Sequence, residues 1–352
     1  MWPQPEPLRR LGPPPQRLFA VGFTPWKRKY LRLCFPRSEL VYIDDPGQVP
    51  ATGAVVAWGT RVDAAALRPG VSLLRVEDGF LRSVGLGADL VRPLSWVIDR
   101  RGLHFDPRRP SDLEVLLSQT VPGALSVEAA RLRDDIVTAR LTKYNVGAAR
   151  WQRPRGAKKV VLVPGQVESD ASLRLGAPGI RCNMTLLQAV RVAEPDAYIV
   201  YKTHPDVAAR LRAAGAGESL ARTWCDEVVA DVPMADLLEA ADELHVMTSL
   251  AGFEALLRGK RVVCHGQPFY AGWGLTHDLH PLPRRVRRLT LAELVAAALI
   301  RYPFYFSRDG RRLSSPREAV HELIRWREET GGPVPWWRHA QRTMLRRAVG
   351  VR

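Results

Sequence analysis

Three polar residues at alternate positions follow the apolar run at residues 160–163, which is predicted to form a buried strand. They are Gln166, Glu168 and Asp170. An extended loop would turn all three side chains toward one side, at the carboxyl end of the strand. Such a group facing a cleft could include a nucleophile and its hydrogen-bonding partners, although the segment taken alone is more simply interpreted as a solvated acidic loop.

A histidine follows the next predicted strand, at residues 197–201. Pro205 disfavours helical geometry at His204 and holds its imidazole at the edge of the sheet. The imidazole could donate a hydrogen bond to a phosphate or leaving-group oxygen, and Lys202 could supply a compensating charge. A single histidine is more often structural, but the Lys-x-His-Pro spacing at a strand end favours a functional role.

A strand-helix-strand unit is predicted from strands at residues 244–247 and 262–264 and a helix at 249–257. The helix begins at Thr248 or Ser249. Its unpaired N–H groups and positive end would then face the carboxyl edge of a parallel sheet, where phosphate-bearing ligands bind. An ordinary helix N-cap explains the same residues without a ligand.

Two more segments follow predicted strands. Glu77, Asp78 and, after a glycine, Arg82 would expose charged groups at a strand end, or would form a turn with solvated charges. Residues 266–276 interleave three glycines with three aromatic residues, and this loop could approach a ligand with its backbone and stack rings beside it. Dinucleotide, Walker, zinc and Ser/His/Asp signatures are absent from the sequence.

The elements that carry these residues occur in two series of short apolar runs separated by amphipathic or Pro- and Gly-containing spacers. This alternation predicts two Rossmann-like α/β lobes with parallel sheets, arranged as in a two-lobed (GT-B-like) nucleotide-sugar transferase with its active site in the cleft. The first series of strands is expected at residues 18–23, 40–43, 54–58 and 73–76, and the second at 160–163, 197–201, 228–230, 244–247 and 262–264. The expected divisions are a Pro-rich arm at 1–16 that is disordered or wraps the fold, lobes at 17–150 and 151–300, and a helical, basic segment at 301–352. An amphipathic helix is expected at residues 125–143.

The composition is that of a soluble globular protein, with 46% hydrophobic and 25% charged residues among 352. No window reaches the ~18 uninterrupted apolar residues of a membrane span, and the first residues lack the pattern of a secretory signal. We therefore expect a cytoplasmic protein. Its four cysteines are scattered without metal-type pairing, which predicts reduced thiols.

The net charge of +16 is concentrated in residues 284–352, which hold sixteen Arg against six Asp or Glu. Trp326, Trp336 and Trp337 lie in the same segment. Guanidinium groups and indoles suit the interface of an anionic membrane, whereas a solvated basic helix explains the charge equally well. Nucleic-acid binding is disfavoured because the excess is terminal and no nucleic-acid module is recognisable.

Together these segments resemble the capsular-polysaccharide β-Kdo transferases of the KpsC type, which use CMP-activated keto-deoxy-octulosonic acid (Kdo). The similarity extends from Phe19 to about Tyr305. Proteins of this type usually carry two such modules in tandem; this chain has the length of one, and it looks most like the C-terminal module. His104 departs from the family pattern, which tends to have an aromatic residue at that point. The matching motifs are EDGFLRSVGLG at 77–87, PLS at 93–95, KYN at 143–145, GQVESDAS at 165–172, HPDV at 204–207 and the run at 248–276.

The resemblance implies a retaining transfer of Kdo from CMP-β-Kdo through a covalent carboxylate adduct. It implies that Asp170 is the nucleophile, with Gln166 and Glu168 beside it, and that His204 contacts the departing phosphate. No metal ion or other cofactor is required, because a helix end, His204 and Lys202 meet the phosphate charge. The implied donor-binding residues are Lys202, Pro205, Thr248, Ser249, Gly252 and Glu254. The implied acceptor-positioning residues, on the opposite lobe, are Glu77, Asp78 and Arg82.

We expect the protein at the inner face of the cytoplasmic membrane, associated peripherally through its basic tail. The expected partners are CMP-Kdo, a Kdo-containing and lipid-linked oligosaccharide acceptor, the anionic membrane surface and other capsule-assembly proteins, without nucleic acid. The alternative is a non-catalytic polysaccharide- or lipid-binding role in capsule assembly. The presence of both Asp170 and His204 argues against that alternative.

Overall fold

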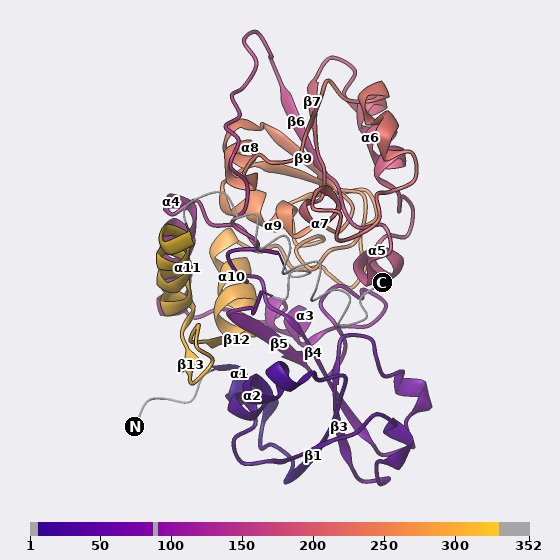
Figure 1. Ribbon diagram of the computed structural model, residues 1–352, viewed down its shortest axis with the longest axis vertical. Helices are drawn as coiled ribbons and strands as arrows, with labels where there is room; N and C mark the ends of the chain where they lie inside the picture. Colours follow the sequence, from indigo (N-terminus) through magenta and orange to yellow (C-terminus); the bar gives the residue numbers. More distant parts are fainter. Residues whose placement is uncertain (1–5, 87–90, 331–352) are drawn as a thin grey trace.

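The computed structural model describes residues 6–86 and 91–330, which form two α/β lobes joined along one broad junction (Figure 1). This confirms the predicted two-lobed architecture. The N-terminal lobe is built on sheet A, a seven-stranded sheet, and the C-terminal lobe on sheet B, which has six strands.

Sheet A is mixed, whereas a parallel sheet was expected. Its strands are β1 (Arg17–Val21), β2 (Glu39–Tyr42), β3 (Ala54–Trp58), β4 (Ser72–Asp78), β5 (Ser95–Asp99), β12 (Pro303–Phe306) and β13 (Leu313–Ser314), in the order β13-β12-β5-β4-β3-β1-β2. The first four strands run parallel, but β5 is antiparallel to β4, β12 is antiparallel to β5, and β13 is antiparallel to β12. β5 follows β4 directly in the strand order of the sheet and runs back alongside it, which gives the antiparallel pairing.

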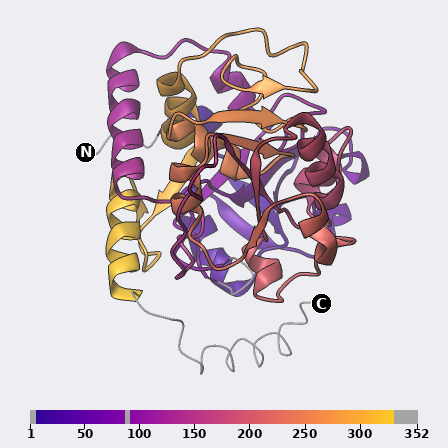
Figure 2. The ribbon, with the colours of Figure 1, turned by 90° about the horizontal axis from the view of Figure 1, so that it is seen from above.

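The C-terminal part of the chain returns to the N-terminal lobe. Residues 303–306 form a strand of sheet A, between β13 at the edge and β5, so the expected helical segment at 301–352 is not helical throughout. Helix α11 lies on the same flank of the molecule as α4 (Figure 2), and α4 also packs against α10. The helices associated with this lobe are α1 (Glu6–Leu11), α2 (Pro25–Cys34), α3 (Asp112–Leu117), α4 (Gly123–Thr138), α10 (Leu291–Val295), the π-helix η5 (Ala296–Arg301) and α11 (Pro316–Thr330).

Two helical boundaries differ from expectation. Part of the Pro-rich arm forms helix α1, which wraps onto the lobe through an ion pair between Arg10 and Asp112. The amphipathic helix expected at residues 125–143 ends at Thr138, because Arg140 adopts a left-handed conformation with φ of 55°. The residues after Arg140 are thereby released to cross between the lobes.

Sheet B is entirely parallel and doubly wound. Its strands are β6 (Val160–Pro164), β7 (Tyr198–Lys202), β8 (Glu227–Val229), β9 (Glu243–Val246), β10 (Arg261–Cys264) and β11 (His277–Asp278), in the order β11-β10-β9-β6-β7-β8. The chain moves outward from β6 through β7 to β8 and then crosses back to β9. Ligands of such sheets bind outside the carboxyl ends of the strands, at the point where the order reverses, which here lies between β6 and β9. The helices of this lobe are α5 (Ala171–Gly176), α6 (Asn183–Ala193), α7 (Pro205–Ala208), α8 (Met234–Ala240) and α9 (Leu250–Leu257).

One hydrophobic core continues across the junction of the lobes. Phe80, which follows β4, stacks on Phe269 of the C-terminal lobe with ring centroids 4.5 Å apart, and both belong to the largest buried cluster. His104 packs edge-on against Phe80 and Tyr302, so it occupies the space of an aromatic residue. Burial lowers the pKa of His104 to about 3, and the ring is therefore a neutral part of this core. Within the described part of the chain, no helix combines the length and apolar character that a membrane crossing requires.

Candidate active site at the junction of the lobes

Gln166 and Thr248 join the two loops at the reversal point of sheet B. The Gln166 Nε2 donates to Thr248 Oγ1 over 3.0 Å, and the Thr248 N–H donates to Gln166 Oε1 over 2.9 Å. Both the amide nitrogen and the amide oxygen of Gln166 are therefore hydrogen-bonded to Thr248, and the side chain is buried. Gln166 holds the loop after β6 against the loop after β9 and so positions the residues around it.

The Glu168 side chain binds backbone N–H groups and does not face the same side as Gln166 and Asp170. Its carboxylate accepts hydrogen bonds from the N–H of Asn183, at the start of α6, and from the N–H of Ala216. The predicted extended loop is wrong, because the Asp170 N–H donates to the Val167 carbonyl over 2.9 Å and closes a turn. The three alternating side chains consequently point to different partners.

Asp170 is the N-cap of α5, where its Oδ1 accepts a hydrogen bond of 2.8 Å from the Ser172 N–H. Among the residues that the structure describes, its Oδ2 accepts no hydrogen bond, and the side chain is exposed. The negative charge of Asp170 favours the protonated forms of Lys143 and His204 and so tends to raise the pKa of each. These effects place Asp170 near both groups.

His204 is the N-cap of α7, and its Nδ1 accepts a hydrogen bond from the Asp206 N–H over 3.1 Å. The ring proton therefore lies on Nε2. Burial and, to a smaller extent, the nearby charge of Lys143 lower the pKa of His204 to about 4. At neutral pH the imidazole is thus an uncharged hydrogen-bond donor.

Lys202, expected to offset phosphate charge, is instead tied to the loop after β8. Its Nζ donates to the carbonyls of Ala230 and Val232, over 2.9 and 2.7 Å, and burial lowers its pKa to about 8. Pro205 occupies the first position of α7, where its missing N–H costs no helical hydrogen bond.

The helix after β9 begins as predicted, with Ser249 as its N-cap accepting a hydrogen bond from the Ala251 N–H. Gly252 has a packing role, because a Cβ at that position would lie 2.3 Å from the hydroxyl oxygen of Tyr270. The Tyr270 hydroxyl itself donates to the Ser249 carbonyl. Glycine thus lets the tyrosine lie against the first turn of α9.

Glu254 points from α9 toward the segment that crosses between the lobes. Its Oε1 accepts a hydrogen bond of 2.6 Å from the Lys143 N–H. Burial raises the pKa of Glu254 to about 7, an effect that Arg258 and Lys143 only partly offset. This contact fixes Lys143 rather than leaving the carboxylate open to a ligand.

The charged residues at the carboxyl end of β4 and just after it lie on the opposite side of the junction. Arg82 is buried, and its Nε donates a hydrogen bond to Asp78 over 2.7 Å. Burial lowers the pKa of Arg82, but the negative charge of Asp78 raises it, and the net shift is upward. Burial and the charge of Asp78 raise the pKa of Glu77 to about 7. Asp78 is therefore ion-paired, whereas Glu77 changes protonation near neutral pH.

Lys143 is the residue at the junction that the sequence patterns did not single out. Its carbonyl accepts from the Ser83 N–H and its N–H donates to Glu254, so its backbone bridges the two lobes. Burial lowers the pKa of Lys143, but Tyr144, Asp78 and Asp170 outweigh it and raise the pKa. Its ammonium group thus lies among negative groups from both lobes. Lys143 follows no strand, and only its place in the KYN motif could have drawn attention to it.

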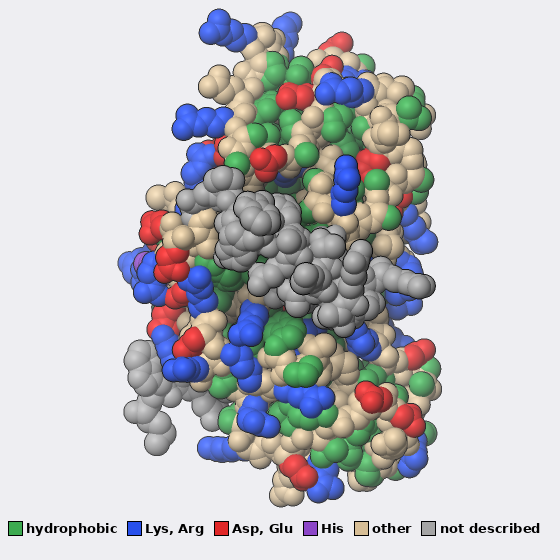
Figure 3. All heavy atoms as spheres, viewed as in Figure 1, with side chains coloured by type: hydrophobic (Ala, Val, Ile, Leu, Met, Phe, Trp, Pro, Cys, Tyr) green, Lys and Arg blue, Asp and Glu red, His purple; other side chains and the backbone are tan. Residues whose placement is uncertain are grey.

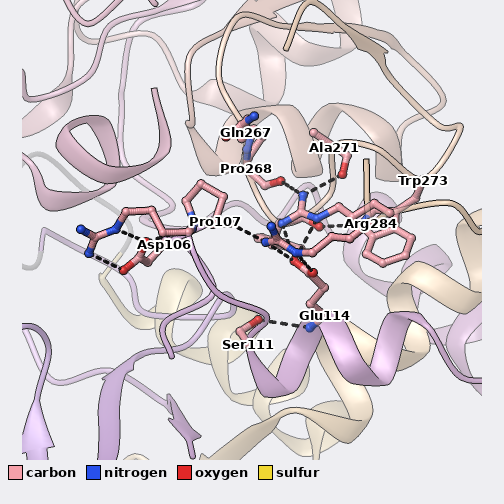
Figure 4. Close-up of polar contacts among 12 residues, drawn as sticks. Asp106, Pro107, Ser111, Glu114, Gln267, Pro268, Ala271, Trp273 and Arg284 are labelled. Atoms are coloured by element: carbon pink, nitrogen blue, oxygen red, sulfur yellow. Dashed lines mark hydrogen bonds and ion pairs between the residues drawn. The ribbon is translucent and has the colours of Figure 1, made fainter. Parts of the chain in front are cut away.

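The glycine- and aromatic-rich loop at residues 266–276 packs its rings into the core and is held by arginine side chains, so its rings are not exposed for stacking on a ligand. Arg285 donates to the carbonyls of Pro268 and Ala271, over 2.7 and 2.8 Å, and pairs with Glu114 of α3 (Figure 4). Arg284 binds the same carboxylate. The rings of this loop are buried, and Glu114 ties it to the N-terminal lobe.

One group of residues with metal-ligating side chains occurs in the described ranges, and it lies away from the junction. Glu194, Glu243 and His245 bring ligand atoms close together. The Lys159 Nζ pairs with both carboxylates, at 2.7 and 2.9 Å, and Lys159 and Glu243 lie at the amino end of sheet B. The ammonium group of Lys159 already neutralises the carboxylates of Glu194 and Glu243, so these residues do not fit a metal site.

The raised pKa of Glu254 predicts a stability change with pH. The folded protein retains this proton between pH 4.5 and about 7, where the unfolded chain has released it, so stability falls as pH rises through this window. Glu254→Gln keeps the oxygen that accepts from Lys143 but removes the charge. We expect this variant to gain roughly 1–3 kcal/mol relative to wild type between pH 5 and pH 8. Urea denaturation of both proteins at the two pH values measures the difference.

Glu128→Gln, at an exposed site on α4, is the control. An identical pH dependence of stability in all three proteins would contradict the assignment of the raised pKa to Glu254.

Comparison with known sequences identifies relatives over most of the chain. Residues 53–148 and 141–305 match the family of capsule polysaccharide biosynthesis proteins. The chain is 42% identical over 319 residues to the capsule polysaccharide modification protein LipA of Neisseria meningitidis serogroup B; the match covers 88% of this chain and 45% of LipA. It is 38% identical over 333 residues to the lipopolysaccharide-processing protein LpsZ of Rhizobium meliloti, covering 90% and 75%. The chain therefore spans about half the length of LipA.

Two solved structures from Thermosulfurimonas dismutans resemble the whole fold. The KpsC β-Kdo 2,7 transferase is 37% identical with a TM-score of 0.71, covering 88% of this chain and 99% of that structure. The KpsC β-Kdo 2,4 transferase is 32% identical with a TM-score of 0.74, covering 87% and 97%. The resemblance to KpsC-type proteins inferred from the motifs is thereby confirmed. With the family match over most of its length, this chain belongs to the capsule polysaccharide biosynthesis protein family.

Proposed function

We propose that this protein is a retaining glycosyltransferase that moves Kdo from CMP-β-Kdo to a Kdo-containing, lipid-linked acceptor in capsule synthesis. The observation that carries the proposal is the convergence of Asp170, His204 and Lys143 at the junction of two lobes. The similarity to two Kdo transferases over nearly their entire length supports it.

In the first step, the Oδ2 of Asp170 attacks the anomeric carbon of Kdo. The bond to the cytidylate phosphate breaks, and its electron pair leaves with the phosphate oxygen. The neutral His204 donates a hydrogen bond to that phosphate, and the N-terminus of α9 at Ser249 favours its charge. We assign charge compensation to Lys143 in place of Lys202, whose ammonium is occupied by carbonyls.

In the second step, an acceptor hydroxyl attacks the same carbon from the face that the phosphate left. The carboxylate of Asp170 departs, and two displacements restore the original configuration. The hydroxyl proton passes to a carboxylate of the N-terminal lobe, a role we assign to Glu77 because a pKa of about 7 suits a base at neutral pH. Asp78 and Arg82 then position the acceptor.

Incubating the protein with CMP-Kdo and a short Kdo-primed acceptor tests the function. Mass spectrometry is expected to show an acceptor lengthened by one Kdo residue, with release of CMP. Binding of the acceptor without any lengthening would contradict the proposal and favour the non-catalytic role in capsule assembly.

His204→Ala is expected to weaken CMP binding by roughly 1.5–3 kcal/mol, the usual contribution of a hydrogen bond to a charged group. Binding should not depend on added divalent ions, because a helix terminus and side chains meet the phosphate charge. Calorimetric titration of CMP with and without a chelator measures both effects. His321→Ala, at an exposed position of α11, is the matched control. A strict magnesium requirement, or equal affinity of the His204 variant and wild type, would contradict this account.

We also propose that the basic tail holds the protein peripherally on an anionic membrane, on the cytoplasmic side. Trp336 and Trp337 lie outside the described residues, whereas Trp326 packs against the core and under Arg308, which removes it from the proposed anchor. Removal of residues 333–352 should release the protein from anionic liposomes without affecting transfer to a soluble acceptor. If the full-length and truncated proteins co-sediment equally with the liposomes at physiological salt, the tail does not anchor the protein to the membrane.

A further inference from the structure

The strand order of sheet A also reverses, at the point between β1 and β3. The chain passes from β1 through α2 to β2 at the edge of the sheet, and then returns to β3 on the other side of β1. The register places Trp58, at the end of β3, beside Val76 of β4, and Gly22 lies against Trp58. Ligands of parallel strands bind outside the carboxyl ends at such a reversal. Glu77 follows Val76 at the same edge.

Lys27, in the first turn of α2, places its ammonium group over this edge. The Lys27 Nζ lies 3.1 Å from the centroid of the Trp58 ring and 5.5 Å from that of Trp26, and both distances are those of cation–π contacts. Trp58 is itself held by edge-on contacts with Phe23 and Trp96, whose ring centroids are 6.0 and 5.2 Å away. A fixed aromatic surface therefore supports the ammonium group.

The charge of Lys27 is partly balanced by carboxylates of β4. Burial lowers the pKa of Lys27 to about 8, and the charges of Asp78 and Glu77 offset this effect only in part. Arg61 and Arg82 also act on Lys27, and both lower its pKa. A further carboxylate bound beside the ammonium group would favour its charged form.

The hydrogen-bonding capacity of Lys27 is not used by the described part of the chain. An ammonium group carries three N–H donors, and no residue in the described ranges accepts a hydrogen bond from the Lys27 Nζ. Another lysine of the same helix differs, because the Lys29 Nζ donates to the Asp309 carbonyl over 2.7 Å. Lys27 therefore has donors available for a ligand at the reversal point.

Glu77 connects Lys27 to the reaction proposed above. Each of the two groups affects the pKa of the other, so they lie near one another. The Glu77 carboxylate lies against Gly59, since a Cβ at that glycine would be 3.2 Å from Glu77 Oε2. Gly59 directly follows β3 and has a φ of 56°, which favours glycine. The carboxylate assigned as the base thus lies at the same reversal point as Lys27.

We propose that Lys27 binds the carboxylate of the acceptor's terminal Kdo residue and so selects an acidic sugar. An ammonium group pairs with a carboxylate through charge-assisted hydrogen bonds. Lys27 holds one end of the sugar in this way, while Glu77 takes the proton of a hydroxyl. The identity of the acceptor rests on the proposed function, but binding of the sugar can be measured without turnover.

Calorimetric titration compares the methyl β-glycoside of Kdo with its neutral carboxamide at pH 7 and about 0.15 M salt. Wild type should bind the acid on the order of tenfold more tightly than the amide. Lys27→Met keeps an apolar chain against Trp58 but removes the charge, so its affinities for the two sugars should agree within about twofold. A protein with this selectivity that transfers no Kdo would contradict the proposed reaction and not the role of Lys27.

Lys29→Met is the matched control, because it removes one positive charge from the same helix. It should keep the wild-type preference for the acid. Lys and Arg side chains are spread over both lobes (Figure 3), and this control separates a specific contact from their general charge. Thermal denaturation verifies the fold of both variants. A preference for the acid that is absent from wild type, retained in Lys27→Met or lost equally in both variants would overturn the proposal.

The titration of Lys27 gives a second readout, which a purely structural lysine would not produce. Because its pKa is about 8, Lys27 is mostly neutral at pH 9, and wild type should lose most of its preference for the acid there. Lys27→Arg keeps its charge at both pH values and should keep its preference. Glu77 gains charge over the same range in both proteins, so their difference isolates Lys27. An equal pH dependence of the two proteins would contradict the proposal.

Discussion

Asp170→Asn is expected to abolish Kdo transfer, with a loss on the order of 10³-fold or more, because the amide cannot form the covalent adduct. The change should leave the fold intact. Asparagine is as good an N-cap as aspartate, and its Oδ1 can still accept from the Ser172 N–H at the start of α5. A loss of transfer with an unchanged melting temperature and unchanged CMP affinity would therefore be chemical rather than structural.

Asp63→Asn is the matched control for this variant. Asp63 also caps a short helix, accepting a hydrogen bond of 3.0 Å from the Ala65 N–H in the N-terminal lobe, so the same amide is placed in the same kind of cap. Transfer activity should be preserved in that variant. Turnover of the Asp170 variant at the wild-type rate would remove Asp170 from the mechanism.

Lys143→Met should lower kcat/KM for transfer by roughly 10²–10³-fold. Methionine keeps much of the aliphatic length, and the backbone contacts to Ser83 and Glu254 remain, but the positive charge at the centre of the site is lost. The charge of Asp170 would then lose the compensation that Lys143 supplies, and the departing phosphate would lose a positive charge beside it. Steady-state kinetics measures the loss.

The same variant has a second readout, which a purely structural role would not produce. Because Lys143 lowers the pKa of His204, its removal should shift the His204 titration upward from about 4, as followed by NMR. Lys260→Met is the control, since the Lys260 Nζ donates to the Glu239 carbonyl at an exposed position. Reduced transfer with an unmoved His204 pKa would contradict the placement of Lys143 beside that histidine.

Much of the fold followed from the periodicity of apolar residues. The runs at residues 160–163 and 54–58 correspond to β6 and β3, which are buried, because parallel strands covered on both faces need continuous apolar sequence. The antiparallel pairing of β5 with β4 and β12 was not predictable. The pairing of β12 with β5 joins segments about two hundred residues apart, and it depends on tertiary contacts that no local pattern records.

The candidate site divides in a similar way. Strand ends and capping patterns located His204 and Ser249, because these features depend on neighbouring residues only. The partner of a side chain depends on the rest of the fold. Lys202 turns to the loop after β8, and Gly252 makes room for Tyr270, and neither contact is visible in the sequence around the residue. The likeness to KpsC-type proteins supplied the expected chemistry but not these contacts.

Trapping the covalent intermediate tests the central claim most directly. The protein is mixed with CMP-Kdo in the absence of acceptor, quenched in acid, digested and analysed by mass spectrometry. The proposal predicts that the peptide containing Asp170 gains the mass of one Kdo residue and loses it when acceptor is added before the quench. A product with inverted anomeric configuration, formed without any modified peptide, would contradict it.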